Sequence, residues 1–239
     1  IFFSPYSIST ALGMTWAGAR GQTAEEMAQV LHFKDTPDVH ASFAALQHSL
    51  AQANGKNGNQ LLIANALWGQ DGYPFLKDFL GLVEKNYGGG LRTVDFENET
   101  EKARQTINTW VSKQTQEIIK ELIKPGILNE FTRLVLTNAI YFKGSWAKPF
   151  PEGLTEEDAI GPMSFYSNTG ELETPQMGQE ETFPYADNEE LQILELPYKG
   201  NDLSMIILLP REKDGVSSLT LTADKLDILL SKLQERKVR

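Results

Sequence analysis

The segment Leu134–Phe142 (LVLTNAIYF) constrains the fold of this chain more than any other part of the sequence. It is almost continuously apolar, and its length is that of a strand rather than of a helix. An apolar strand without polar alternation is typical of a sheet that is covered on both faces. The sequence therefore predicts a sheet with packed layers on both of its sides at this position.

Asn138 lies in the middle of that apolar segment. An amide side chain has two donors and two acceptor sites, and leaving them unpaired in a dry interior costs about 1–3 kcal/mol. Asn138 must therefore have a polar partner. One interpretation is a buried polar network at the centre of the sheet, which serves specificity or switching more often than stability. The other is that Asn138 marks a strand end facing a helix cap, and the residues alone leave both open.

Helical signals dominate the first part of the chain. Helix starts with capping residues are indicated at three places, Ser4-Pro5, Thr23–Glu26 and Pro37-Asp38. Thr23–Glu26 has the form of a capping box, in which the threonine hydroxyl and a glutamate carboxylate each satisfy an N–H group of the helix start. The longest amphipathic helix is predicted over Thr100–Leu122, because its apolar side chains recur at helical spacing, at Ile107, Trp110, Val111 and Ile118.

Strand signals become more frequent later in the chain. Besides the central segment, strands are predicted at Leu61–Trp68, Leu91–Phe96, Leu191–Leu196 and Leu203–Leu209. The last two form a pair around a turn at 198–202, and a final helix carries Leu226, Leu229, Leu230 and Leu233. Helices first and mostly strands later predict an α+β fold with a large sheet. We find no internal repeat and no linker, so residues 1–239 are expected to form a single domain.

The composition excludes several classes of function. A formal charge of −10 with dispersed basic residues argues against nucleic acid as a partner, since that affinity comes from clustered Lys and Arg. The absence of cysteine removes disulfides, thiol nucleophiles and thiolate metal sites. No apolar run is long enough to span a membrane. The region 48–60 carries Lys56 as its one basic side chain, so no polyanion site is expected there.

The sequence offers no constellation for catalysis. His32, His40 and His48 do not have the i, i+4 spacing of a zinc-binding helix, and we interpret them as surface histidines. No nucleophile elbow, phosphate-binding loop or dinucleotide motif is present. No nucleophile, base and orienting group can be assembled, so we expect no enzyme, no catalytic residue, no metal and no cofactor.

Three stretches, taken in order, resemble the serpin family, the serine protease inhibitor superfamily. They are the opening IFFSPYSISTALGMTWAGARGQTAEEMAQVL, the segment LVLTNAIYFKGSW followed by Pro149-Phe150, and the hairpin LQILELPYKGNDLSMIILLP. The long helix predicted over Thr100–Leu122 also has its counterpart in that family. The resemblance covers essentially the whole chain. It implies a serpin-like α+β fold, with a multi-helix domain packed on large mixed and antiparallel sheets.

The resemblance also implies that parts of the family fold lie outside this chain. Ile1-Phe2-Phe3 read as the middle of a strand, and the first helix of the family would precede them. The C-terminal part of the family, with its hinge and reactive-centre loop, would follow Arg239. The chain is therefore expected to be an incomplete serpin-like domain. The residue that determines protease specificity is expected outside it.

The activity implied by the resemblance is suicide inhibition of serine, and sometimes cysteine, proteases. In this family a metastable fold presents a bait loop, the protease becomes acylated by it, and the cleaved loop inserts as a new strand of the main sheet. The resemblance implies that Ser4, Ser7 and Asn138 belong to the polar cluster called the shutter, a conformational switch. Trp146 matches the tryptophan of the breach, where the loop first enters the sheet.

The partners implied are a target protease, with neither nucleic acid nor membrane, and the protein is expected to be a monomer with a liability to polymerise. An extracellular location is implied by family resemblance alone. The alternative function is that of a non-inhibitory serpin, a carrier or chaperone whose loop cannot insert. The hinge would discriminate between the two, and it is not present in this chain.

Overall fold

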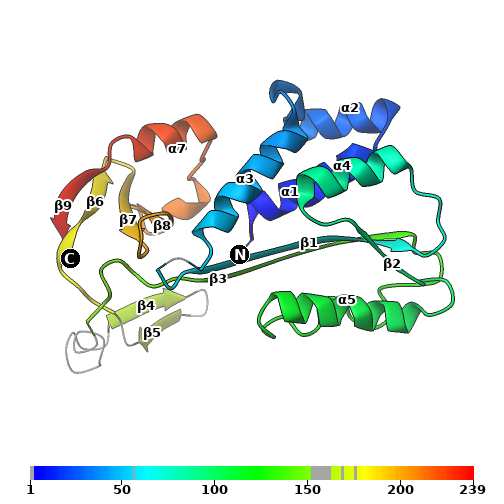
Figure 1. Ribbon diagram of the computed structural model, residues 1–239. Coiled ribbons are helices and arrows are strands. Elements are labelled where there is room, and N and C mark those ends of the chain that lie inside the picture. Colours follow the sequence, from blue (N-terminus) through cyan, green and yellow to red (C-terminus); the bar gives the residue numbers. More distant parts are fainter. Residues whose placement is uncertain (1–2, 56, 152–162, 168–169, 175–176) are drawn as a thin grey trace. The chain divides into compact units, whose positions relative to one another are not determined.

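The computed structural model describes residues 3–55, 57–151, 163–167, 170–174 and 177–239, and Figure 1 shows their helices and strands. The opening strand expected at Ile1–Phe3 falls mostly outside this range. The chain divides into two compact units. The first contains Ile1–Lys56 and Gln60–Lys143, and the second contains Asn57–Asn59 and Gly144–Arg239.

The first unit is built on a three-stranded mixed sheet with the strand order β2-β1-β3. β1 (Gln60–Gln70) pairs with β2 (Leu91–Val94) in parallel and with β3 (Leu134–Lys143) in antiparallel orientation. Its helices are α1 (Pro5–Gly18), α2 (Gly21–Val30), α3 (Val39–Ala53), α4 (Lys77–Tyr87), α5 (Thr100–Gln114) and the short 3-10 helix η1 (Phe33–Asp35). Among the described residues β3 therefore lies at an edge of the sheet.

Helices cover both faces of this sheet. Figure 1 shows α5 on one side of β1 and β3, and α1, α3 and α4 on the other. The core on the α5 side contains Ala64, Ala66 and Trp68 of β1, with Ala139 of β3. The core on the α1 side contains Leu67 of β1, against which Leu134 and Leu136 of β3 pack. The prediction of packed layers on both sides of the central strand is confirmed.

Two of the three predicted helix starts are confirmed. The hydroxyl oxygen of Ser4 accepts a hydrogen bond from the N–H of Ser7, and Asp38 accepts one from the N–H of Ala41. The capping box was wrong. α2 begins at Gly21, whose φ of 56° breaks the chain away from α1, so Thr23 already lies within the helix.

The helix predicted over Thr100–Leu122 ends early, because α5 stops at Gln114. The Thr115 hydroxyl donates to the carbonyl oxygen of Val111 and accepts from the N–H of Ile119, which turns the chain out of the helix. The Asn108 amide then holds both backbone groups of Ile123 at 2.8 and 2.9 Å. Tertiary hydrogen bonds thus override the helical periodicity, and Ile118, expected on the buried stripe, is 70% exposed.

The second unit is largely antiparallel. A hairpin joins β4 (Met163–Ser167) to β5 (Gly170–Thr174), and a four-stranded sheet has the order β8-β7-β6-β9. Its strands are β6 (Glu181–Asp187), β7 (Leu191–Pro197), β8 (Ser204–Pro210) and β9 (Gln234–Val238). The 3-10 helix η3 (Gly215–Ser217) and α7 (Ala223–Leu230) lie between β8 and β9 in sequence. The predicted β7–β8 hairpin is confirmed, whereas β9 was not predicted.

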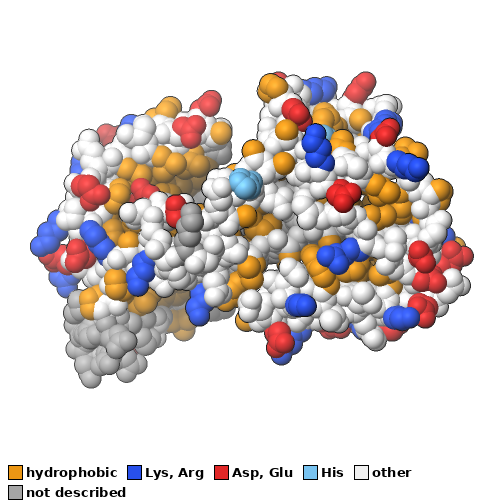
Figure 2. Space-filling model, viewed as in Figure 1, with side chains coloured by type: hydrophobic (Ala, Val, Ile, Leu, Met, Phe, Trp, Pro, Cys, Tyr) orange, Lys and Arg blue, Asp and Glu red, His pale blue; other side chains and the backbone are white. Residues whose placement is uncertain are grey.

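Helix α7 covers one face of this second sheet, and the other face is partly exposed among the described residues. Leu229 of α7 packs with Ala186, Leu191 and Ile193 in a buried cluster. Apolar side chains of β8 remain exposed at Met205, Ile207 and Leu209. Figure 2 shows hydrophobic side chains on the surface of this unit. Both units together have the α+β content that the sequence predicts. No described helix is both long and apolar enough to cross a membrane.

Gly69 lies at a tightly packed position of the first unit. A Cβ atom at Gly69 would come within 2.6 Å of the Phe75 ring and 2.9 Å of Leu91. We expect Gly69→Ala to lower the free energy of unfolding by about 1–3 kcal/mol, because overpacking forces neighbours out of place. Urea unfolding measures this change. The control is Gly81→Ala in α4, where a Cβ meets nothing within 4 Å and helix propensity predicts a gain of about 0.5–1 kcal/mol. Equal effects of the two variants would contradict the packing.

Candidate functional site

Asn138 has its polar partner in the neighbouring strand. Asn65 of β1 and Asn138 of β3 are directly opposite in the antiparallel register. The Nδ2 atom of Asn138 donates a hydrogen bond to the Oδ1 atom of Asn65. Both side chains are half-buried. Cross-strand pairs of this kind have Cβ atoms about 5 Å apart, so the two amides are within hydrogen-bonding distance in the regular strand geometry.

The asparagine pair faces the layer that contains α1. Leu67 and Leu136 pack in the core on the α1 side. Because side chains of a strand alternate between its faces, Asn65 and Asn138, each two residues away from one of these leucines, point to the same side. α1 contacts both β1 and β3. The polar pair therefore interrupts the apolar layer between the sheet and this helix.

The two serines predicted for the polar cluster have different positions. Ser4 caps α1 through its hydroxyl oxygen, 3.2 Å from the Ser7 nitrogen. Ser7 is 1% exposed on the buried face of α1, and its hydroxyl has no hydrogen-bond partner among the described residues. Within that part of the chain no hydrogen bond joins either serine to Asn138. The structure thus brings Asn138 together with Asn65 and places Ser7 in the helix that covers their face of the sheet.

This layer has unused hydrogen-bonding capacity. Besides the Ser7 hydroxyl, the Nδ2 atom of Asn65 is buried without a partner among the described residues. An unsatisfied buried polar group costs about 1–3 kcal/mol. The polar pair therefore stabilises the fold less than an apolar pair of similar size would.

Trp146 lies in the second unit and is held by Tyr198. The two residues form an antiparallel bridge, and their rings are stacked with centroids 4.5 Å apart at an angle of 11°. Phe150 packs edge-on against Trp146 with a centroid distance of 6.4 Å. Tyr198 is 6% exposed, and burial raises the pKa of its hydroxyl. Trp146 itself is half-buried, so one part of the indole stays accessible.

One histidine departs from the surface interpretation. His32 and His48 are exposed. His40 is half-buried, stacks on Trp16 with ring centroids 5.1 Å apart, and its Nδ1 atom is hydrogen-bonded to the Tyr87 hydroxyl at 2.7 Å. Burial lowers the pKa of His40, and Asp38 acts in the opposite direction. His40 thus belongs to an aromatic core. No group of three or more metal-ligating side chains is found among the described residues.

Sequence reasoning missed Asn65. It carries the same signal as Asn138, a polar amide within an apolar strand segment, here Leu61–Trp68. Its role depends on a strand register that joins residues 73 positions apart. A search for amides in both apolar strands would have found it.

Comparisons with known proteins agree over the whole chain. The family model described as "Serpin (serine protease inhibitor)" matches residues 1–239. The leukocyte elastase inhibitor of Xenopus tropicalis is 44% identical over 236 residues, covering 97% of this chain and 60% of the relative. Serpin B3 of Homo sapiens is 41% identical over 245 residues, covering 95% of this chain and 62% of the relative. The chain thus spans less than two thirds of the length of these relatives.

Solved structures show the same likeness. Ovalbumin from emu (Dromaius novaehollandiae) has a TM-score of 0.90 and 32% identity, over 100% of this chain and 65% of that protein. A loop-inserted structure of a cleaved ovalbumin mutant has a TM-score of 0.85 and 30% identity, over 99% of this chain and 65% of the ovalbumin.

A double-mutant cycle tests the asparagine pair. We expect Asn65→Ala and Asn138→Ala each to lower the free energy of unfolding by about 1–3 kcal/mol, because each leaves a buried amide unpaired. The double variant should lose about 1 kcal/mol less than the sum, since it removes both partners together. Urea unfolding of all four proteins measures this coupling. Asn138→Ala combined with Asn108→Ala, on the other side of the sheet, should be additive, and equal behaviour of the two cycles would exclude the pair.

Proposed function

The chain belongs to the serpin family, and we propose that it is part of an inhibitor of serine or cysteine endopeptidases that acts by suicide covalent trapping. The observation that carries this proposal is the match to a serine protease inhibitor family over residues 1–239. Relatives named leukocyte elastase inhibitor support it. The first helix and the C-terminal part of the domain, with the reactive-centre loop, are proposed to complete the fold.

The proposed reaction uses the protease's own catalytic groups. Its serine oxygen adds to the carbonyl carbon of a peptide bond in the bait loop, the C–N bond breaks, and the leaving nitrogen takes a proton from the protease's histidine. The loop then remains attached to the protease as an ester. Insertion of the loop into the main sheet distorts the protease before water hydrolyses that ester. No residue of this chain reacts covalently, so its contribution is conformational.

β3 is the proposed neighbour of the inserted strand. It pairs with β1 on one side and lies at the sheet edge among the described residues, where backbone N–H and C=O groups can accept another strand. Strand insertion satisfies such groups, a use of β-augmentation within one molecule. The same edge explains the expected liability to polymerise, because a loop from a second copy would find the same partner.

The polar side chains between this sheet and α1 are proposed as the shutter. Asn138 joins β3 to β1 through its hydrogen bond to Asn65, and Ser7 lies in α1, which covers this face of the sheet. The unpartnered Ser7 hydroxyl and Asn65 amide leave donors for a group from the rest of the domain. Ser4 contributes through the cap that fixes the start of α1. Trp146, stacked on Tyr198, is proposed as the breach residue.

A non-inhibitory role as a carrier or chaperone is the second candidate. It is favoured by the likeness to ovalbumin structures, whose names mention no protease. The location also stays a prediction. The names of the relatives give no support to the extracellular location implied by the resemblance, so the proposal does not depend on secretion.

The proposal is tested with the complete protein and a panel of trypsin-like, chymotrypsin-like and elastase-like serine proteases. Each mixture is boiled in denaturant and separated on a gel. We expect a band at the summed mass of inhibitor and protease less the peptide that follows the cleaved bond, because the ester bond survives denaturation. Clean cleavage of the protein without such a band, across the whole panel, would support the carrier or chaperone instead.

Asn138→Ala tests the shutter within this function. We expect the variant to convert faster to loop-inserted or polymeric forms on heating, because the polar contact between the central strands is lost. Native gels after timed incubation measure the conversion. Thr137→Ala is the matched control, since Thr137 bonds Trp68 on the opposite face of the same strand. If Asn138→Ala and the parent converted at the same rate, or if Thr137→Ala had the larger effect, Asn138 would have no switching role.

A further inference from the structure

Asn59 is a buried amide in a segment whose composition indicates an ordinary polar loop. It lies in the sequence Asn57–Asn59 that belongs to the second unit, directly before β1 begins at Gln60. Its side chain is 1% exposed although Ser145 and Lys199, the residues it contacts, are themselves exposed. Burying an asparagine side chain in a loop costs free energy unless its amide is hydrogen-bonded.

Both polar atoms of the Asn59 amide form hydrogen bonds with backbone groups. Its Oδ1 atom accepts a hydrogen bond from the N–H of Ser145 at 3.2 Å, and its Nδ2 atom donates to the carbonyl oxygen of Lys199 at 2.7 Å. The N–H of Lys199 in turn donates to the carbonyl oxygen of Ser145 at 2.8 Å. These three bonds form a closed ring of Asn59, Ser145 and Lys199.

The ring has the geometry of an antiparallel ladder with one amide inserted. Trp146 and Tyr198 are a bridge pair, flanked by the bonds from Lys199 to Ser145 and from Ala147 to Pro197. In a regular ladder of this pattern the N–H of Ser145 would bond directly to the carbonyl oxygen of Lys199. The Asn59 amide lies between these two groups instead. The direct hydrogen bond is therefore replaced by two hydrogen bonds, one from Ser145 to Asn59 and one from Asn59 to Lys199.

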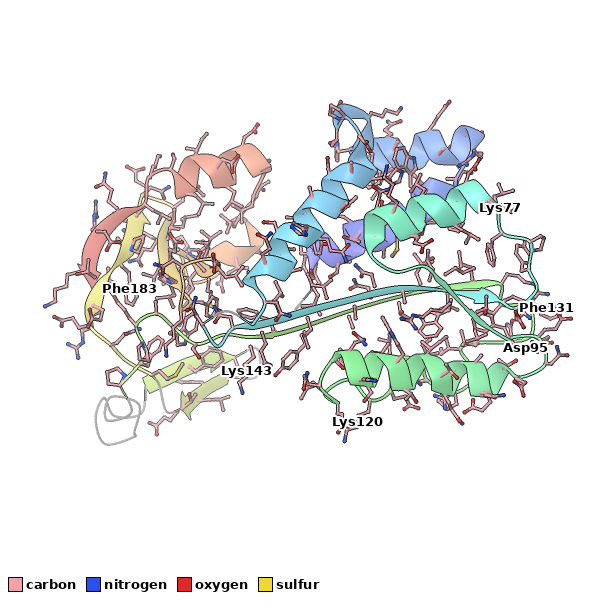
Figure 3. The ribbon with its side chains drawn as sticks, in the orientation of Figure 1. Lys77, Asp95, Lys120, Phe131, Lys143 and Phe183 are labelled. Carbon is pink, nitrogen blue, oxygen red and sulfur yellow. The ribbon has the colours of Figure 1, made fainter. Side chains whose placement is uncertain are left out.

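This arrangement determines where Trp146 is held. Trp146 and Tyr198 form the pair between the two flanking bonds, in which side chains on adjacent strands are close, and their rings stack at 4.5 Å. One end of this short ladder is the bond from Ala147 to Pro197, and the other end is the Asn59 ring. Lys143, labelled in Figure 3, ends β3 just before the segment that the ring fastens.

We propose that Asn59 is a positioning residue that fastens the segment 144–147 to the turn after β7 and thereby holds Trp146 in the closed arrangement before a loop inserts. This role rests on the proposed function. In this proposal, insertion of a strand beside β3 moves the segment that follows Lys143 away from Lys199. The amide bonds of Asn59 add to that barrier, and their loss lowers it.

The first test needs no inhibitory activity. Hydrogen exchange of the complete protein is followed by mass spectrometry for peptides covering 143–147. In Asn59→Ala we expect the Ser145 amide to exchange about three- to tenfold faster, because its acceptor is gone. Asn59→Asp keeps the side-chain shape and the acceptor for Ser145 but removes the donor to Lys199, so it should raise the exchange of the Ser145 amide less than Asn59→Ala does. Unchanged exchange in both variants would overturn the proposal.

The matched control is Asn54→Ala. Asn54 is an exposed asparagine in the same connection, and its Oδ1 atom accepts a hydrogen bond from the N–H of Leu61. Removing it deletes one amide of the same type without touching Ser145 or Lys199. Exchange of the Ser145 amide should match that of the parent protein.

The second test measures the functional consequence. We expect Asn59→Ala to lose its protease-trapping activity several-fold faster than the parent and Asn54→Ala during incubation at 37 °C. Equal lifetimes of the three proteins, with faster Ser145 exchange, would leave Asn59 as a structural clamp and overturn its role in insertion. A parent that traps no protease would refute the proposed function, whereas the exchange experiment would still decide whether Asn59 fastens the segment.

Discussion

The antiparallel ladder between β1 and β3 is the interaction on which the first unit depends. It runs from Gln60 opposite Lys143 to Gly69 opposite Leu134, and its register decides which side chains enter each layer. Alanines and Trp68 pack under α5, whereas leucines pack under α1. The same register places Asn65 opposite Asn138. A slip of β3 by one residue would turn Asn138 to the other face and separate it from Asn65.

Several groups in the described residues have no partner within them. The sheet has an edge at β3, the Ser7 hydroxyl and one Asn65 donor are unpartnered, and β8 exposes apolar side chains among the described residues. Such groups are sites where another strand or side chain can bind. A fold that changes by accepting a strand needs sites of this kind, which is why they agree with the proposed inhibitor.

Local signals made much of the fold predictable. The cap at Ser4, the apolar strand at β3 and the β7–β8 hairpin each depend on a few neighbouring residues. The end of α5, the pairing of Asn65 and the inserted amide of Asn59 depend on partners distant in sequence. β9 has the polar sequence QERKV and becomes a strand only through its pairing with β6. These features could not be predicted from local sequence, because they depend on long-range pairing.

We propose that the sheet containing β3 gains a strand when the reactive loop is cut. The most direct measurement is thermal unfolding of the complete protein before and after a single cleavage in its reactive loop. Insertion adds a strand's hydrogen bonds at the edge of β3, and a gain of several kcal/mol raises the unfolding midpoint of a domain this large by roughly 10 °C or more. We expect the cleaved protein to show that rise. A cleaved protein that unfolds at the same or a lower temperature would contradict it.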